Sequence, residues 1–387
     1  MNATLGSGPD PTPPPVRREA RHAPAVLEQV PVRRRLAELR GAAVPPHPLD
    51  ARALAALAAN PGCERRTLLD GAGVNKAALA QALGSPAALG QSQFAFMRGN
   101  AFEARVKSDG AAVLLRLLGV EDPSGALTPD VSAAGPEGRT ARTALALREA
   151  TAAKAWTLLD HPMLALEVAG TPVYLEPDAV VVHPDGHWTV VEIKSFPMLD
   201  GSADAAKVGA AARQAAVYVL ALEQVAAKVA GAEVGHRVLL VCPKDFSNLP
   251  AGAVVDVRKQ LQVTRRQLAR MHRVEELAAA VPQGTTFDPS SCSAQELAAA
   301  VEAVDAAYAP ECLAACELAF HCRERARSAG AVETLGRGVR GELGGLTTVE
   351  EVLDAAAGVS GDPADPTVAT LRRAAALRAD ALAARGT

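Results

Sequence analysis

The chain has 387 residues, of which 49% are hydrophobic, 3% are aromatic and 21% are charged, and its formal net charge is −3. This length predicts two or three domains with sizeable cores. The small negative charge excludes a uniformly basic molecule, so any nucleic-acid-binding surface must be a local patch. The sequence contains neither a long apolar run nor an apolar leader segment, which argues against a membrane protein and favours a cytoplasmic one.

The first 48 residues are rich in proline, glycine and arginine, so residues 1–48 are expected to form a mostly disordered arm. Three consecutive arginines at 33–35 either contact phosphates or lie on a solvated short helix. Short helical runs follow, with a break at Asn60-Pro61-Gly62 immediately before Cys63. We place the main domain at 49–330 and a C-terminal helical extension at 331–387, for which the sequence indicates no chemistry.

A helix is expected over 94–118, because apolar residues recur there near a period of 3.6. Gly99 and Glu103 lie four residues apart and therefore share a face of this helix. The small glycine would let another backbone or a DNA strand approach the carboxylate. Glu103 is thus a candidate acidic metal ligand, and an exposed surface charge is the alternative. A second helix is expected over 143–159, followed by a strand at 164–168.

The stretch from 171 to 218 carries most of the chemistry. Strands are expected at 173–182 and 188–194, and the turn-rich segment 183–187 between them predicts a hairpin that brings Asp178 beside Glu192. Since side chains alternate faces along a strand, Glu192 and Lys194 emerge on the same face. Two carboxylates and a lysine then converge. Such a set suits a hard cation, Mg²⁺ or Mn²⁺, and phosphodiester hydrolysis by an oriented water.

The elements that follow complete the pattern of one domain. A helix over 205–225 carries Gln214 and Tyr218 one turn apart, and a strand is expected at 236–241. The order helix, three strands, helix, strand predicts an α/β domain with a mixed sheet flanked by helices. A further helix over 257–280 bears one stripe of basic residues, which either follows a nucleic-acid backbone or forms a solvated face: Lys259, Arg266, Arg270 and Arg273.

Three of the six cysteines cluster near the end of the main domain, at Cys312, Cys316 and Cys322. In a long chain from a reducing compartment, such a cluster favours a metal or cluster site over disulfides. Three sulfurs leave the site one ligand short. Cys63 is the best candidate for the fourth ligand, and Cys292 is the second choice. A shared site would close a loop of roughly 250 residues, and its loop-closure entropy would correspond to about 5 kcal/mol.

Taken together, these residues resemble the PD-(D/E)XK nuclease superfamily. The resemblance is to the RecB-like branch that carries an iron–sulfur cluster, as in the CRISPR-associated RecB-like nucleases and the AddB nuclease domain. It extends from Cys63 to Cys322. The matching motifs are the acidic motif at Asp178, Glu-x-Lys at Glu192-Ile193-Lys194, Gln-xxx-Tyr at Gln214 to Tyr218, and the first helical motif at Gly99 and Glu103.

The resemblance implies an α-β-β-β-α-β core with a helical iron–sulfur lobe. It also implies a Mg²⁺- or Mn²⁺-dependent deoxyribonuclease in which Lys194 assists the water and Gln214 and Tyr218 support DNA or the motif loop. The implied metal ligands are Glu103, Asp178, Glu192 and the Ile193 carbonyl. The implied ligands of a [4Fe–4S] cluster, for which zinc is the alternative, are Cys63, Cys312, Cys316 and Cys322.

Two positions depart from the pattern of this family. Glu103 stands where the cluster-bearing relatives often have histidine, which makes the site harder and more anionic. The spacing from Cys312 to Cys316 is x3 where x2 is commoner, which affects the cluster type. The chain also lacks a Gly-xxxx-Gly-Lys-Ser/Thr run, so no helicase motor is fused to it and any unwinding would come from a partner.

Two functions fit the sequence. The first is a DNA nuclease that acts on single strands or free ends, in DNA repair or recombination or in defence against foreign DNA, with a helicase or defence-system protein as a possible partner. The alternative is a non-catalytic DNA-binding scaffold whose iron–sulfur cluster is structural or redox-sensing. The presence of Asp178, Glu192 and Lys194 together favours the enzyme.

Overall fold

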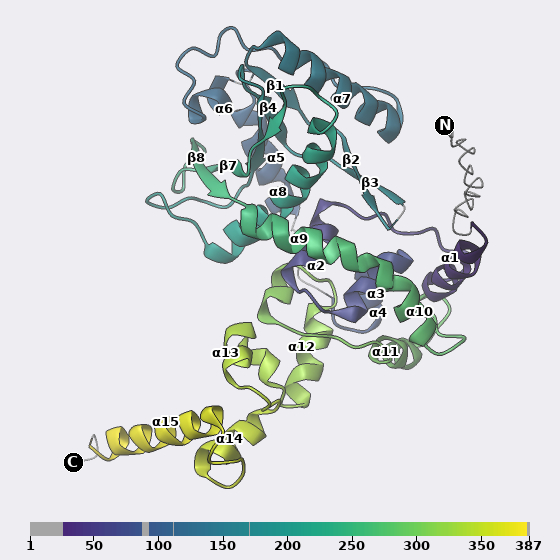
Figure 1. The fold of residues 1–387 in the computed structure, drawn as a ribbon, viewed down its shortest axis with the longest axis vertical. Helices are drawn as coiled ribbons and strands as arrows, with labels where there is room; N and C mark the ends of the chain where they lie inside the picture. Colours follow the sequence, from purple (N-terminus) through teal and green to yellow (C-terminus); the bar gives the residue numbers. More distant parts are fainter. Residues whose placement is uncertain (1–25, 87–92, 111, 170, 385–387) are drawn as a thin grey trace, which may run out of the picture.

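The computed structural model describes residues 26–86, 93–110, 112–169 and 171–384. Figure 1 shows a lobe built around a sheet and a lobe of helices, with helix α9 (Arg258–Arg270) crossing between them. The C-terminal helices extend away from the helical lobe. No helix within the described ranges is long and apolar enough to cross a membrane.

A six-stranded mixed sheet forms the centre of the first lobe, in the order β1-β4-β5-β7-β8 with β6 beside β5. Its neighbours are antiparallel except for β5 with β6 and β5 with β7, which are parallel. The strands are β1 (Thr157–Asp160), β4 (Ala179–Val182), β5 (His187–Ile193), β6 (Glu233–Val234), β7 (Arg237–Pro243) and β8 (Pro250–Asp256). The protein is therefore an α/β protein with a mixed sheet, as the order of elements predicts.

Helices cover both faces of this sheet, which explains why β4 and β5 are buried along nearly their whole length. Val180 and Val190 pack toward α7 (Gly135–Ala153) and α8 (Ala205–Ala226). Val181 and Val191 pack on the opposite face, toward α5 (Gln93–Val106) and α6 (Ala112–Leu117). The expected hairpin is confirmed: β4 and β5 are antiparallel neighbours, and Ala179 pairs with Val191.

The first strand of the sheet differs from the prediction. Residues 164–168 do form a strand, β2 (Leu164–Val168), but it pairs only with β3 (Thr171–Leu175) in a separate two-stranded sheet. The sheet begins instead with β1, in residues that the prediction assigned to the end of a helix. Helix α7 ends at Ala153 because Lys154 adopts a left-handed conformation, with φ of 50°, and the aromatic and β-branched residues after it suit a strand.

Three other elements are interrupted where one continuous element is expected. The strand expected at 173–182 is divided into β3 and β4 around Pro177, which has no N–H for a ladder. The helix expected over 94–118 is two helices, α5 and α6, separated by a turn that includes Gly110 with φ of 70°. The helix expected over 257–280 is α9, the 3₁₀ turn η1 (Met271–Arg273) and α10 (Val274–Ala280).

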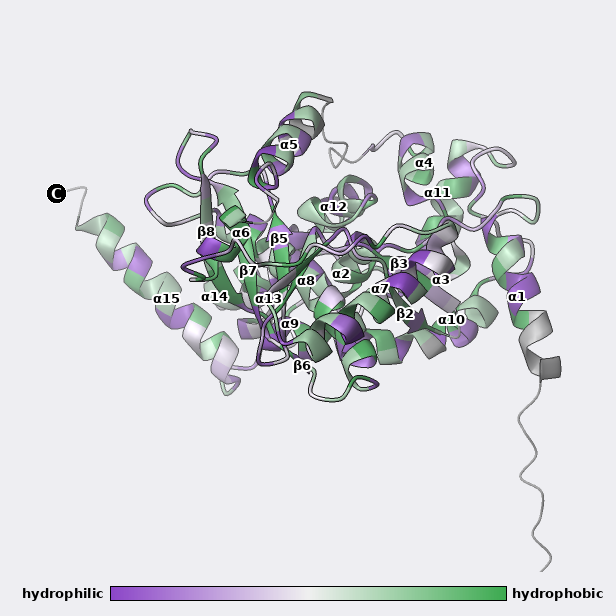
Figure 2. Ribbon diagram, turned by 90° about the horizontal axis from the view of Figure 1, so that it is seen from above, coloured by the Kyte–Doolittle hydropathy of each residue, from purple (hydrophilic) through white to green (hydrophobic). Residues whose placement is uncertain are grey.

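The helical lobe joins residues from both ends of the main domain. It contains α2 (Ala51–Ala59), α3 (Glu64–Ala72), α4 (Lys76–Ala82), α11 (Ala294–Glu302), the 3₁₀ turn η2 (Pro310–Ala314) and α12 (Ala319–Ser328). The 3₁₀ turn η3 (Val332–Leu335), α13 (Arg337–Glu342), α14 (Val349–Ala357) and α15 (Pro366–Ala383) follow. Figure 2 shows α15 projecting from the body of the molecule.

The N-terminal arm differs from the disorder expected through residue 48. It contains α1 (Val26–Arg40), and Leu39 is fully buried in the core. Arg35 donates hydrogen bonds to the carbonyls of Ala278, Val281 and Pro282 at the end of α10. This guanidinium therefore completes a helix end rather than contacting phosphate. Residues 1–25 lie outside the described residues.

Candidate functional site

Two carboxylates and a lysine meet where β4 begins and β5 ends. Asp178 Oδ2 accepts a hydrogen bond from the backbone N of Ile193 at 2.6 Å. Glu192 is only 1% exposed, its Oε1 forms an ion pair with Lys194 Nζ, and its Oε2 has no hydrogen-bond partner among the described residues. A buried carboxylate oxygen without a donor is costly, and a bound cation would relieve that cost.

Burial controls the protonation of these three groups. It raises the pKa of Glu192 to about 7, although the charge of Lys194 opposes the shift. Burial also raises the pKa of Asp178, again against Lys194. For Lys194, burial alone would lower the pKa, but the carboxylates of Glu192 and Asp178 outweigh it and raise the pKa. Near neutral pH the site thus holds an ammonium group and a Glu192 carboxyl close to its titration midpoint.

Glu103, the proposed third acidic ligand, is already engaged. Its Oε1 lies 2.6 Å from Lys107 Nζ and 2.9 Å from His161 Nε2. The hydrogen bond from His161, together with Lys107, lowers the pKa of Glu103 to about 2. Lys107 Nζ also donates to the Asp178 carbonyl at 2.9 Å and lies 2.6 Å from Asp160 Oδ1. The Lys107 ammonium is therefore shared by the oxygens that face it.

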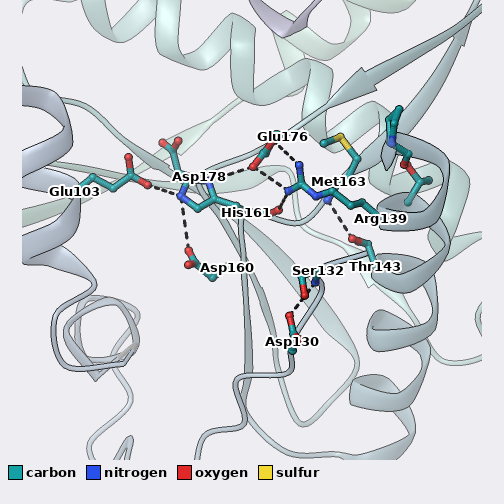
Figure 3. Close-up of polar contacts among 12 residues, drawn as sticks. Glu103, Asp130, Ser132, Arg139, Thr143, Asp160, His161, Met163, Glu176 and Asp178 are labelled. Atoms are coloured by element: carbon teal, nitrogen blue, oxygen red, sulfur yellow. Dashed lines mark hydrogen bonds and ion pairs between the residues drawn. The ribbon is translucent and has the colours of Figure 1, made fainter. Parts of the chain in front are cut away.

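Figure 3 shows the His161 ring between the side chains of Glu103, Asp160 and Glu176. Its Nδ1 lies 3.7 Å from Glu176 Oε1, and Arg139 Nη2 donates to the same carboxylate oxygen at 3.0 Å. The sequence reasoning missed this cluster. Lys107 could have been found one helical turn after Glu103, but His161 follows β1, which the sequence pattern assigned to a helix.

Gln214 and Tyr218 meet on α8 as their spacing predicts. Gln214 Nε2 donates to Tyr218 Oη at 2.9 Å. Burial and then the charge of Glu192 raise the pKa of Tyr218 well above its ordinary value, so the phenol stays protonated beside the carboxylates. At Gly99, by contrast, an added Cβ would meet only Ser195 Oγ, at 3.9 Å. The space there does not require glycine.

A groove of about 510 Å³ opens beside Lys194. Its walls come from α2, α5, α8 and residues 314–315 at the end of η2. Among its described lining residues the one carboxylate is Asp204, which caps α8 by accepting a hydrogen bond from the Lys207 backbone N at 2.9 Å. The basic residues that line it are Arg52, Arg98, Lys194, Lys207 and Arg213.

The basic stripe expected on one helix lies elsewhere. Its four residues, at 259, 266, 270 and 273, are exposed along α9 and η1, and the described lining of the groove includes none of them. Arg273 also makes ion pairs with Glu64 at 3.4 Å and with Glu276 at 3.3 Å. The stripe therefore lies outside the described lining of the groove.

Four cysteines from the two ends of the domain line a single cavity of about 20 Å³, namely Cys63, Cys312, Cys316 and Cys322. Cys63 immediately precedes α3, whereas the other three lie in η2, after it and in α12. Helix α3 is tied to this second segment by Arg65, whose backbone N donates to Asp305 O at 2.8 Å and whose side chain donates to Val304 O at 3.0 Å. Cys292 is not among the described lining residues.

The sulfur atoms in this cavity accept hydrogen bonds from neighbouring side chains. Asn60 Nδ2 donates to Cys312 Sγ at 3.2 Å, and Arg65 Nη1 donates to Cys322 Sγ at 3.3 Å. Burial nevertheless raises the pKa of both thiols to about 11. Burial also raises the pKa of Cys316. All the cysteines are free, so Cys312, Cys316 and Cys322 are neutral thiols near pH 7.

Neither set of residues already has the arrangement of a metal centre. In the part of the chain that the structure describes, no group of three or more His, Cys, Asp or Glu residues could hold a metal ion. The types of donor atom nevertheless fit the implied groups, because carboxylate and carbonyl oxygens suit Mg²⁺ or Mn²⁺ and thiolates suit iron or zinc. Binding of either would require local rearrangement.

Comparison with known proteins adds one distant likeness. No protein family matches the chain, and a search of curated proteins finds no significant match. Among solved structures, the chain is similar to one from Eubacterium rectale named "Putative exonuclease", with 12% sequence identity and a TM-score of 0.31 over 59% of this chain and 82% of that chain. The fold and the site themselves define an α/β protein with a buried carboxylate–lysine site at the edge of a basic groove.

Proposed function

We propose that the protein is a metal-dependent nuclease that hydrolyses phosphodiester bonds of DNA. The observation that carries this proposal is Glu192, a buried carboxylate whose Oε2 has no hydrogen-bond partner in the described structure. It lies beside a second carboxylate, Asp178, and beside Lys194, which lines the groove. Protein interiors rarely keep such an oxygen unpaired unless a cation or a proton compensates it.

In this proposal, Asp178, Glu192 and the Ile193 carbonyl hold Mg²⁺ or Mn²⁺. The bound ion would supply a Lewis acid that stabilises charge on the phosphate and lowers the pKa of water. Lys194 remains protonated at the groove, where its ammonium can orient a phosphate oxygen or the attacking water. Glu103 joins this ligand set only if it exchanges its contacts with Lys107 for the metal ion.

The cysteine cavity is proposed to hold a [4Fe–4S] cluster, with zinc as the alternative. Its support is the convergence of four sulfurs from distant parts of the chain, together with the hydrogen bonds that Asn60 and Arg65 donate to two of them. When bound, such a group would cross-link α3 to the segment from η2 to α12. Its role in this proposal is structural.

A second function has one observation in its favour. Because Glu103 is engaged by Lys107 and His161, the acidic residues are not grouped as a ready metal site. A non-catalytic DNA-binding scaffold would not need Glu103 to leave Lys107 and His161 for a metal ion. The nuclease proposal ranks first because a scaffold has no use for the buried carboxylate pair. Action on single strands or free ends, and a helicase or defence partner, belong to the nuclease proposal.

Cleavage assays with isosteric variants test this function. Purified protein is incubated with labelled single- and double-stranded DNA in Mn²⁺, Mg²⁺ or EDTA. We expect Asp178→Asn and Glu192→Gln to lower the cleavage rate at least about a hundredfold, as expected when electrostatic stabilisation of the transition state is lost. Asp185→Asn, in the exposed turn of the same hairpin, is the control and keeps the rate. If wild type cleaves no faster than the two site variants, the protein is not a nuclease through this site.

A further inference from the structure

We infer that the groove beside Lys194 binds a single nucleic-acid strand through its phosphates, without regard to base sequence. The inference rests on the proposed nuclease function, because the carboxylates lie behind Lys194 at the groove. It assigns substrate binding to four residues that do not lie along one helix: Arg52, Arg98, Lys207 and Arg213.

These four cations come from three helices. Arg52 is on α2, Arg98 on α5, and Lys207 and Arg213 on α8. Within the described ranges none of them forms an ion pair with an aspartate or glutamate, whereas Arg139, Arg265 and Arg325 elsewhere on the surface each do. Grouped cations repel one another, so a polyanion in the groove is stabilised.

The one carboxylate in the groove does not cancel this charge. Asp204 caps α8, where the positive end of the helix dipole already compensates it. Within the groove Arg52 lies near Lys194, and outside it Arg337 lies near Arg213, where Glu311 offsets part of the charge. The excess of positive charge is therefore distributed along the groove rather than held at one point. A chain of phosphates requires this distribution.

The size of the groove selects a strand over a duplex. Pockets of roughly 300–1,000 Å³ enclose molecules of drug size, so a groove of about 510 Å³ takes one or two nucleotides between its walls. A duplex carries its phosphates on the outside of a much wider body and would have to lie across the groove. Helices α2 and α8, which pack against each other, both contribute residues to the walls of the groove.

An aromatic ring in the same groove suits an unpaired base. Phe196 lines the groove, is partly exposed, and has Lys207 Nζ 6.0 Å from its ring centroid. Aromatic rings beside basic side chains bind single strands by stacking, which works for every base. The lining amide, Gln214, already donates to Tyr218. The groove thus favours binding that does not depend on sequence.

The test measures binding in EDTA, so that cleavage cannot interfere. Fluorescence anisotropy is recorded with three labelled probes: an oligothymidylate, a mixed-sequence strand of equal length and a blunt duplex of that sequence. The groove variants are Arg52→Glu/Arg213→Glu and Phe196→Leu. Arg266→Glu/Arg270→Glu examines the stripe on α9. Arg373→Glu/Arg378→Glu, on the projecting helix α15, is the control with the same change of charge.

We expect both strands to bind wild type equally and the duplex to bind more weakly. Arg52→Glu/Arg213→Glu weakens strand binding at least about tenfold and makes the logarithmic salt dependence shallower by about 0.7 for each lost phosphate contact. Phe196→Leu weakens it about tenfold without changing the salt dependence, as expected for lost stacking. The α9 and α15 variants bind as wild type does. Thermal unfolding checks that each variant is folded.

Three results would overturn the inference: equal or tighter binding of the duplex, a larger loss in the α9 variant than in the groove variants, or an equal loss in the α15 control. Asp178→Asn removes a proposed metal ligand but no groove residue, so it separates strand binding by the groove from the proposed nuclease function. If wild type binds strands as expected but never cleaves, the groove assignment stands and the nuclease proposal fails. If wild type cleaves while the groove variants bind normally, the groove assignment alone fails.

Discussion

The carboxylate site and the cysteine cavity are both buried, and burial raises pKa values in both, but they are assembled differently. Asp178, directly before β4, and Glu192, in β5, belong to one hairpin and are joined through the hydrogen bond from the Ile193 backbone N to Asp178. The cysteine cavity combines Cys63 with Cys312–Cys322, from opposite ends of the domain. Local strand register thus builds the first, whereas packing between distant helices builds the second.

The two regions also differ in the charge that a metal would meet. At the carboxylate site two ammonium groups, on Lys194 and Lys107, each face one oxygen, of Glu192 and of Glu103 respectively. At the cysteine cavity burial raises the pKa of Cys312, Cys316 and Cys322, so these thiols would have to lose protons on binding a metal. Binding at the first would therefore displace a lysine ammonium and, below about pH 7, a proton from Glu192, whereas binding at the second would release protons from thiols alone. The following predictions test these contrasts, beginning with the largest expected effect.

Cys63→Ser should disturb the whole fold. If Cys63 shares a metal or cluster with the C-terminal cysteines, its loss opens a loop of roughly 250 residues and costs up to about 5 kcal/mol of unfolding free energy. Urea unfolding and iron and zinc analysis of anaerobically purified protein measure both effects. The visible absorbance of wild type distinguishes iron–sulfur from zinc. Cys292→Ser is the matched control, and an equal loss in it would contradict a specific role for Cys63.

Metal affinity at the carboxylate site should depend steeply on pH. The pKa of Glu192 is raised to about 7, so below pH 7 a proton competes with the metal ion for this carboxylate. The half-saturating Mn²⁺ concentration should fall by about tenfold per unit as pH rises toward 7, and level off above it. Calorimetric titration at several pH values measures this dependence. Glu192→Gln should flatten this pH dependence. A wild-type metal affinity that does not change between pH 6 and 8 would contradict the assignment.

Lys107→Met should strengthen metal binding. The substitution removes the ammonium that faces Glu103 and Asp160, so that a divalent cation no longer has to displace it. A charge at this distance shifts the pKa of a neighbouring group by about one unit or more. A comparable effect on metal binding corresponds to about a tenfold lower half-saturating Mn²⁺ concentration. Arg105→Met, on the exposed face of the same helix, is the control. Weaker binding by Lys107→Met would mean that Lys107 organises these oxygens for the metal.

Tyr218→Phe should have the smallest effect. It removes the acceptor of the Gln214 side chain and should lower the unfolding free energy by about 1 kcal/mol. The cleavage rate should fall by less than a factor of about ten, because the carboxylates keep their positions. Metal analysis extends the comparison: a changed iron or zinc content in this variant would show that the two regions are coupled through α8.

The parts of the fold that the sequence predicts correctly are those set by local periodicity. The hairpin of β4 and β5 follows from apolar runs joined by a turn, and α8 from a long apolar helix pattern. Strand β1 could not be recognised, because a short run such as Trp156 to Leu159 suits a helix end as well as a strand. What decides between them is the left-handed conformation of Lys154, which its sequence neighbours do not specify.

The candidate site follows the same division. Strand parity is enough to place Asp178, Glu192 and Lys194 together. The position of His161 depends on β1, and the engagement of Glu103 by Lys107 and His161 depends on how α5 meets that strand. The basic groove combines side chains from three helices, whereas periodicity detects charge only along one helix. Sequence reasoning therefore finds the stripe on α9 and not the groove.

The cysteine cavity and the groove share part of their walls. Ala56 of α2 and Ala315, directly after η2, line both of them. At these two positions the partition is a single small residue, so a bulkier side chain at either one would occupy volume on both sides at once. Mutational drift or engineering that enlarges either alanine would then narrow the groove and crowd the sulfurs together. At these two alanines, therefore, the groove and the cysteine cavity cannot change independently during evolution.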